Sequence, residues 1–166
     1  MSGHRELNEF EQRLIDNVEE HGCQVNLVFD DKGKKPDFAY SIGFAKTVGQ
    51  PEVIIFGLNR KLMQSMINEV LRQCREEGLV LTEDLAISEL IEGFDCIAKK
   101  VHPSQIEEGY FNSSMWYHVQ EFGSELSEAY QIVWPGAQQG LYPWENDCAE
   151  DVIEAQPALY KPSFAA

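Results

Sequence analysis

The segment 37–58, DFAYSIGFAKTVGQPEVIIFGL, constrains the fold of this chain more than any other part of it. It predicts two strands, at residues 38–44 and 52–56, joined by a turn that contains glycine and proline and ended by Gly57. In the first strand large and small side chains alternate, which predicts one packed face and one face of small residues. The second strand is apolar on both faces, so we expect it near the middle of a sheet.

Three other segments have apolar residues at spacings of three and four, which predicts helices at residues 6–20, 59–77 and 110–122. The last helix has an apolar stripe formed by Phe111, Met115, Val119 and Phe122. Apolar or alternating runs predict further strands at residues 23–29, 86–91, 94–101 and 130–134. The segment after residue 135 mixes aromatic residues with glycine, proline and acids, which predicts an ordered loop.

These elements predict an α+β fold, with a mostly antiparallel sheet of about five to six strands and helices packed against it. A chain of 166 residues suits a single domain, which we expect to span residues 1–166. Residues 1–5 and 160–166 are expected to be flexible tails.

The net charge of −15 is unevenly distributed along the chain. No Lys or Arg occurs between Val101 and Tyr160, a segment that contains ten acids. A negative field of this kind repels nucleic acid and anionic lipid, so we expect neither as a partner. It favours a basic protein, with a contact surface at Glu145, Asp147, Glu150 and Asp151. The alternative is that the charge serves solubility alone.

The first residues carry charges where a signal peptide needs an apolar core, and no apolar run reaches the length of a membrane span. We therefore expect a cytoplasmic protein. The four histidines are too scattered to supply the close ligand pair of a zinc site, so we predict no metal site. No motif selects a cofactor.

Two carboxylates are candidates for catalysis because each stands among apolar and aromatic residues. Glu52 follows Gln-Pro, and Glu145 follows Tyr-Pro-Trp. Partial burial would raise the pKa of either carboxyl and suit it to general acid catalysis. The alternative is that they are edge carboxylates, which cap backbone N–H groups or pair with Arg60 or Lys61.

Two further residues, His21 and Ser41, are candidates for a functional site, and each also has a structural explanation. His21, two residues before Cys23, could act in catalysis, or it could interact with the last carbonyls of the first helix. Ser41, with Gly43 beside it, could leave room for a ligand against the backbone. The same small residues are expected where a helix packs closely on a strand.

Four segments carry a resemblance to a known family: PDFAYSIGFAKTVGQPEVIIFGL, QIVWP, GLYPWE and the pair Gln156-Pro157. They resemble the bacterial family named domain of unknown function 4262, over about residues 21–157. The chain has Gln50 where that family often has histidine, and Gly136 where it often has aspartate. The resemblance implies one fold unit and a bacterial origin, and it assigns no activity.

Two functions follow from these features. The first is a non-enzymatic acidic binding module for a basic protein, similar in kind to immunity or modulator proteins. The second is a small-molecule-binding protein or hydrolase-type enzyme with a pocket between strand residues 40–43 and the loop 134–144. Aromatic residues of that loop can also form a satellite core. The ligand-binding residues predicted for the pocket are Tyr40, Ser41, Gly43, Trp134, Tyr142 and Trp144.

Overall fold

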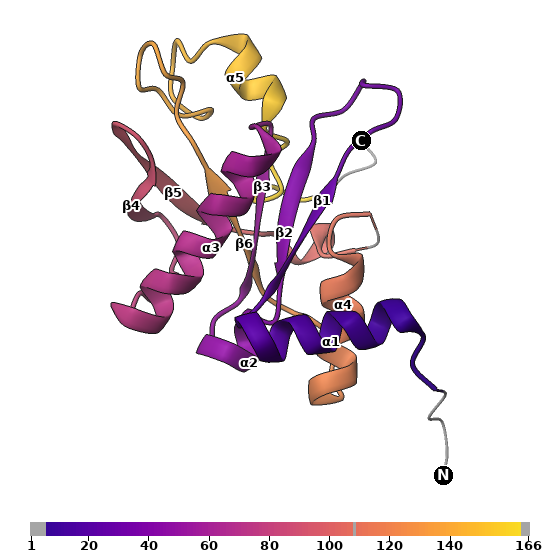
Figure 1. Cartoon of the computed structure of the whole chain (residues 1–166). Coiled ribbons are helices and arrows are strands. Elements are labelled where there is room, and N and C mark those ends of the chain that lie inside the picture. Colours follow the sequence, from indigo (N-terminus) through magenta and orange to yellow (C-terminus); the bar gives the residue numbers. More distant parts are fainter. Residues whose placement is uncertain (1–5, 108, 164–166) are drawn as a thin grey trace.

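A computed structural model of the chain describes residues 6–107 and 109–163 (Figure 1). The first half contains α1 (Glu9–His21), β1 (Gln24–Val28), β2 (Phe38–Ile42), α2 (Phe44–Val48), β3 (Glu52–Phe56) and α3 (Arg60–Glu76). The second half contains β4 (Leu85–Ile91), β5 (Phe94–Lys100), the short 3-10 helix η1 (Pro103–Gln105), α4 (Asn112–Phe122), β6 (Ala129–Val133) and α5 (Glu150–Ala155).

The six strands form one sheet in the order β1-β2-β3-β6-β5-β4. All neighbouring pairs are antiparallel except β3 and β6, which are parallel. The predicted α+β class with a mostly antiparallel sheet is therefore confirmed. The strand predicted for the middle of the sheet is also confirmed, because β3 pairs on both sides and all its residues are buried.

Helices cover both faces of the sheet, so that the core has two layers (Figure 1). On one face, α3 contributes an apolar stripe that includes Met63, Met66 and Val70. On the other face, α1 contributes Leu14 and Val18, and α4 packs beside it. This arrangement follows from strands that are apolar on both sides, which need a cover on each face.

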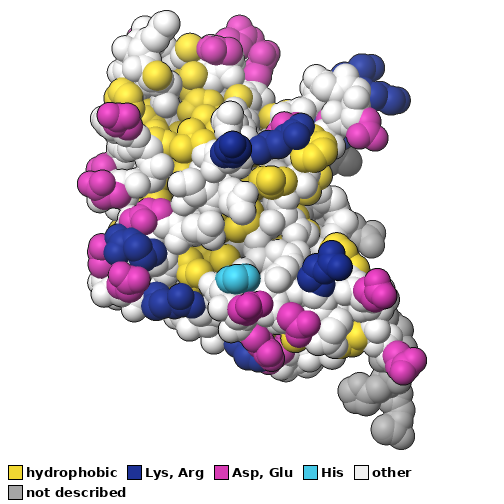
Figure 2. Space-filling model, in the orientation of Figure 1, with side chains coloured by type: hydrophobic (Ala, Val, Ile, Leu, Met, Phe, Trp, Pro, Cys, Tyr) yellow, Lys and Arg dark blue, Asp and Glu magenta, His cyan; other side chains and the backbone are white. Residues whose placement is uncertain are grey.

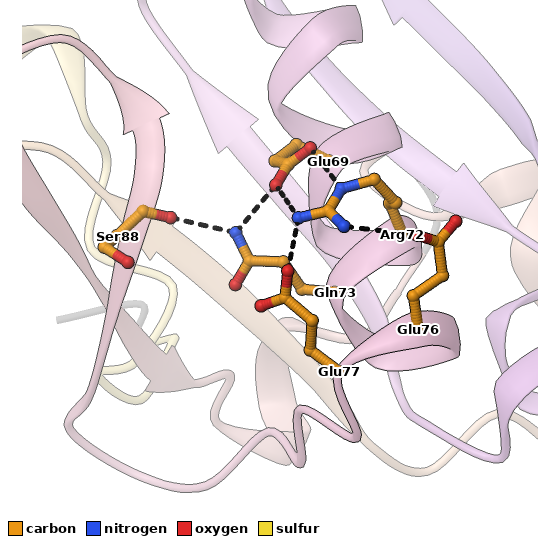
Figure 3. Close-up of polar contacts among 6 residues, drawn as sticks. All are labelled: Glu69, Arg72, Gln73, Glu76, Glu77 and Ser88. Carbon is orange, nitrogen blue, oxygen red and sulfur yellow. Dashed lines mark hydrogen bonds and ion pairs between the residues drawn. The ribbon is translucent and has the colours of Figure 1, made fainter.

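A polar network fastens the end of α3 to the edge strand β4 (Figure 3). Arg72 donates hydrogen bonds to Glu69, Glu76 and Glu77 on the same helix end. Gln73 is 5% exposed, and its amide donates both to Glu69 and to the backbone oxygen of Ser88 in β4. The charged side chains of this helix end therefore bind one another, and Gln73 joins them to the sheet.

Several predicted helix ends are confirmed by their caps. Asn59 accepts hydrogen bonds from the backbone N–H groups of Lys61 and Leu62, which begins α3. Gly22 and Gly123 adopt left-handed backbone conformations after α1 and α4. The predicted hairpin of residues 86–91 and 94–101 is present as β4 and β5.

Two short helices were not predicted. The strand predicted at residues 38–44 ends at Ile42, and the turn after it contains α2. The chain leaves the strand at Gly43, whose φ of 106° is a left-handed conformation that favours glycine. The loop predicted after residue 135 contains α5, which is too short to show a helical pattern of apolar residues.

The helix predicted at residues 110–122 is present as α4, but only part of its apolar stripe is buried. Phe111 is fully buried, but Val119 and Phe122 are 48% and 47% exposed. The helix instead buries Ser114 and Tyr117. A hydrogen bond determines which side of α4 is buried. The Ser114 hydroxyl donates to the backbone oxygen of Ser41 in β2 at 2.7 Å, and this contact fixes the rotation of the helix.

Two further predictions concern the tails of the chain and the absence of a membrane span. Of the predicted tails, residues 1–5 and 164–166 lie outside the described residues, while Ser163 donates a backbone hydrogen bond to Ser104. Among the helices described, none combines the length and the apolar character that a membrane crossing requires.

The contact between α5 and the sheet can be tested at Gly57. A Cβ atom on Gly57 would lie 2.6 Å from the backbone oxygen of Ala155, whereas one on Gly49 would have no atom within 4 Å. Both glycines have positive φ, so either alanine variant costs about 1 kcal/mol in backbone strain. We expect Gly57→Ala to lower the free energy of unfolding by roughly 2–4 kcal/mol, because it adds a clash. Urea denaturation measures both variants, and equal losses would contradict the docking of α5 on Gly57.

Candidate functional site

The predicted candidates Glu52, Ser41 and Gly43 meet at one buried cluster. One oxygen of Glu52, Oε1, accepts hydrogen bonds from the Ser41 hydroxyl at 2.6 Å and from the Phe44 backbone N–H at 3.2 Å. Its other oxygen, Oε2, accepts from the Gly43 backbone N–H at 2.8 Å. The Ser41 oxygen in turn accepts from the Val53 backbone N–H at 2.9 Å. The carboxylate therefore caps the start of α2, as the capping alternative predicts, but it does so from the central strand β3 and not from an edge of the sheet.

The chemistry open to this cluster is proton binding. Glu52 is 2% exposed, and its burial raises its pKa to about 7, although its three hydrogen-bond donors act to lower the pKa. Ser41 is fully buried, so its hydroxyl is out of reach of a substrate in solution. A hollow of about 300 Å³ reaches Glu52 between α2 and the end of α4, with Gln50 and His118 in its lining. The cluster can take up a proton near neutral pH, but Ser41 is not placed for nucleophilic attack.

A second site lies at the carboxyl ends of β3 and β6, the parallel pair. Here a hollow of about 570 Å³, called the α5 hollow below, opens between the sheet and α5. Its apolar walls include Trp134, Leu141 and Val152, and two carboxylates, Asp147 and Asp151, also line it. Ligands of sheets with parallel strands commonly bind outside the carboxyl ends of those strands.

The floor of the α5 hollow is held by polar contacts that the sequence did not reveal. The Trp134 indole N–H donates to the backbone oxygen of Phe56 at 2.8 Å. The Gln156 amide, which is 2% exposed, accepts from the Trp134 backbone N–H and donates to the Trp134 backbone oxygen. Gln156 thus fixes the end of α5 to the end of β6. Its only sequence signal was the Gln156-Pro157 pair of the family resemblance.

The four predicted partner-binding acids lie on the segment that carries the α5 hollow. Glu145, Asp147, Glu150 and Asp151 are all exposed, and Figure 2 shows acidic side chains gathered over α5. Asp147 and Asp151 line the hollow, while Glu145 accepts a hydrogen bond from the Tyr142 backbone N–H at 2.9 Å. The structure therefore brings Trp134, a predicted ligand-binding residue, together with Asp147 and Asp151, which were predicted to bind a partner.

The remaining predicted ligand-binding residues lie elsewhere. Tyr40, Ser41 and Gly43 are buried in the core, and the α5 hollow is lined by α5 in their place. A Cβ on Gly43 would lie 2.6 Å from Val18 of α1, so the small residue serves close helix packing. Tyr142 and Trp144 stack on each other with ring centroids 5.4 Å apart, in the manner of a satellite cluster.

The pair His21 and Cys23 lacks the features of a nucleophilic pair. The His21 side chain is 65% exposed at the end of α1, and its ring lies 3.9 Å from a carboxylate oxygen of Glu20. Burial, and then the charge of Glu52, raise the pKa of the Cys23 thiol to about 12, which suppresses the reactive thiolate. In the part of the chain that the structure describes, no group of three His, Cys, Asp or Glu side chains could hold a metal ion.

Comparison with known proteins gives one match. The family model described as "Domain of unknown function (DUF4262)" matches residues 17–149. No curated protein and no solved structure matches the chain.

The raised pKa of Glu52 predicts a pH dependence of stability. The native state keeps this proton up to about pH 7, whereas a glutamate with the ordinary pKa of 4.5 loses it earlier. Between these values the native state binds more protons than the unfolded state, so its stability falls as pH rises. The free energy of unfolding of the wild type, relative to that of Glu52→Gln, is expected to fall by roughly 3 kcal/mol from about pH 4.5 to pH 8.

Urea denaturation across this pH range measures the difference. Glu154→Gln, at an exposed carboxylate of α5, is the control, and its difference from the wild type is expected to stay constant over the same range. If the wild type instead gains stability over Glu52→Gln as pH rises, the three hydrogen-bond donors outweigh burial and the assignment is wrong.

Proposed function

Because the chain belongs to the DUF4262 family, whose description assigns no activity, we propose its function from the site alone: it is a binding module for a basic protein. The contact surface is the acidic face, defined as Glu145, Asp147, Glu150 and Asp151. The proposal includes a bacterial cytoplasmic setting, of which the bacterial part rests on the family resemblance.

The observation that carries the proposal is that these four carboxylates are exposed and not neutralised. Within residues 6–107 and 109–163, no ion pair joins any of them to a Lys or Arg. Unpaired acids of one sign attract a basic partner over several ångströms and raise its rate of association. A partner would supply the cations that this part of the chain lacks.

The α5 hollow gives the acidic face a place for a specific side chain. A Lys or Arg side chain has an aliphatic stem and a charged head, which suits a hollow with both apolar and acidic walls. The stem can lie along Leu141 and Trp134, and the head can reach Asp147 and Asp151. A guanidinium group also binds well against an aromatic face such as that of Trp134.

The test is binding of a labelled oligo-arginine peptide, followed by fluorescence anisotropy. In the test variant, the four acids become amides: Glu145→Gln, Asp147→Asn, Glu150→Gln and Asp151→Asn. Asparagine tolerates the left-handed conformation of Asp147, whose φ is 70°. We expect the variant to bind at least about tenfold more weakly, which corresponds to roughly 1.4 kcal/mol.

A control variant distinguishes the contribution of the acidic face to peptide binding from that of the net charge of the protein. It removes the same number of charges from exposed acids elsewhere, at Asp16, Glu19, Glu20 and Asp31. We expect its affinity for the peptide to change by less than about threefold, because charges far from a contact are screened. Equal losses in both variants would mean that the peptide responds only to the net charge of −15, and the proposal would fail.

The alternative function, a small-molecule-binding protein, is favoured by one observation. The α5 hollow has a volume of about 570 Å³, which lies within the range of ligand pockets. Free arginine is the probe that separates the two functions. A basic protein partner predicts that arginine alone binds far more weakly than the peptide, and comparable affinities would favour the small-molecule alternative.

A further inference from the structure

The helix α4 exposes an apolar stripe that an amphipathic helix would normally bury. Val119 and Phe122 are about half exposed, although their spacing with Phe111 and Met115 is that of a core face. Beside them lies a hollow of about 660 Å³, called the α4 groove below. Its lining residues are Ile106, Glu107, Met115, Val119, Glu125 and Leu126.

The rest of the fold prevents α4 from burying this stripe. Ser114 donates to the backbone oxygen of Ser41, and the backbone N–H of Ser113 donates to the Tyr40 hydroxyl at 3.1 Å. Tyr117, on the same side, is 2% exposed. Rotating the helix to bury Val119 would break these hydrogen bonds and expose Tyr117. The apolar stripe is therefore held outward by the native structure.

Acidic side chains border the apolar floor of the α4 groove. Glu107 and Glu125 are both exposed, and in the described part of the chain neither forms an ion pair. The neighbouring acids Glu121 and Glu128 are already paired, with Lys46 and Lys100. The groove thus combines apolar contacts at its centre with uncompensated negative charge at its border.

We propose that the α4 groove binds an amphipathic basic segment of a partner protein. Apolar side chains of that segment pack on Met115 and Val119, and its Lys or Arg side chains pair with Glu107 and Glu125. This is the helix-in-groove mode of recognition, in which the flexible methionine adapts to the apolar anchor. A second copy of this chain fits less well, because acidic borders of two copies repel each other.

This surface is distinct from the acidic face. Figure 1 places α4 beside the lower half of the sheet and α5 above its upper end. The inference does not depend on the proposed function, because the lining of the α4 groove and that of the α5 hollow share no residue. Each surface can therefore fail its own test without affecting the other.

The experiment measures binding of a synthetic peptide that has leucine at positions i, i+3, i+4 and i+7 and lysine elsewhere. Val119→Thr keeps the shape of the side chain and adds a polar group to the groove. Val80→Thr is the matched control, since Val80 is 57% exposed at a different place. We expect Val119→Thr to weaken binding at least about fivefold and Val80→Thr to leave it unchanged. The methyl NMR signal of Met115 is expected to shift when the peptide is added.

Two altered probes test the stated chemistry. Replacing the leucines by serine removes the apolar anchors, and replacing the lysines by glutamate reverses the charge; both changes are expected to abolish the shift of the Met115 methyl signal. The shift of the Met115 methyl signal on addition of the leucine-lysine peptide is expected to persist in the amide variant of the acidic face, because this variant leaves the α4 groove unchanged. Equal affinities of Val119→Thr and Val80→Thr would overturn the proposal. So would a wild-type dimer that Val119→Thr dissociates, because the groove would then be covered by a second copy.

Discussion

The structure depends on one buried carboxylate, that of Glu52, at the point where β2 ends. Its hydrogen bonds from the Gly43 and Phe44 N–H groups satisfy donors that the turn would otherwise leave unpaired inside the protein. Its contact with Ser41 joins β2 to the start of β3. The chain can therefore leave the sheet abruptly at Gly43, and Val18 of α1 packs directly against that glycine. One side chain thus sets the path of α2 and the position of α1 together.

This dependence explains which parts of the fold could be predicted. A run apolar on both faces identified β3, apolar or alternating runs identified the β4–β5 hairpin, and apolar spacings of three and four identified α3, because these signals are local. The helix α2 has the sequence FAKTV, whose residues favour strands as much as helices. The start of α2 is fixed by Glu52, which comes after the helix in sequence. Glu52 contacts the Gly43 and Phe44 N–H groups only once β2 and β3 have paired. No local pattern could show that interaction.

The candidate site was predictable only in part, because local patterns reveal its residues but not the long-range contacts that bring them together. The acids Asp147 and Asp151 were identified from the uneven distribution of charge, and Trp134 as one of the aromatic residues of the segment 134–144. Their meeting at one hollow depends on α5, which is fixed by the Gln156 contact with Trp134 across the turn of the chain. On α4 both sides of the helix carry apolar residues, so periodicity alone could not decide which side is buried. The Ser114 hydrogen bond to β2 decides it, and it leaves Val119 outward.

The two surfaces are connected by a single rigid element. Leu126 lines the α4 groove, Trp134 lines the α5 hollow, and the fully buried strand β6 lies between them. At about 3.3 Å per residue, the two residues are separated by roughly 25 Å along the chain. Because β6 (Ala129–Val133) pairs on both sides, the part of this separation that the strand spans cannot adapt to a partner. A partner whose basic segments match this fixed spacing gains affinity from both contacts at once, whereas one with a different spacing uses only one. If both proposed contacts engage one partner, β6 therefore adds geometric selectivity to what each surface selects by its charge and its apolar residues.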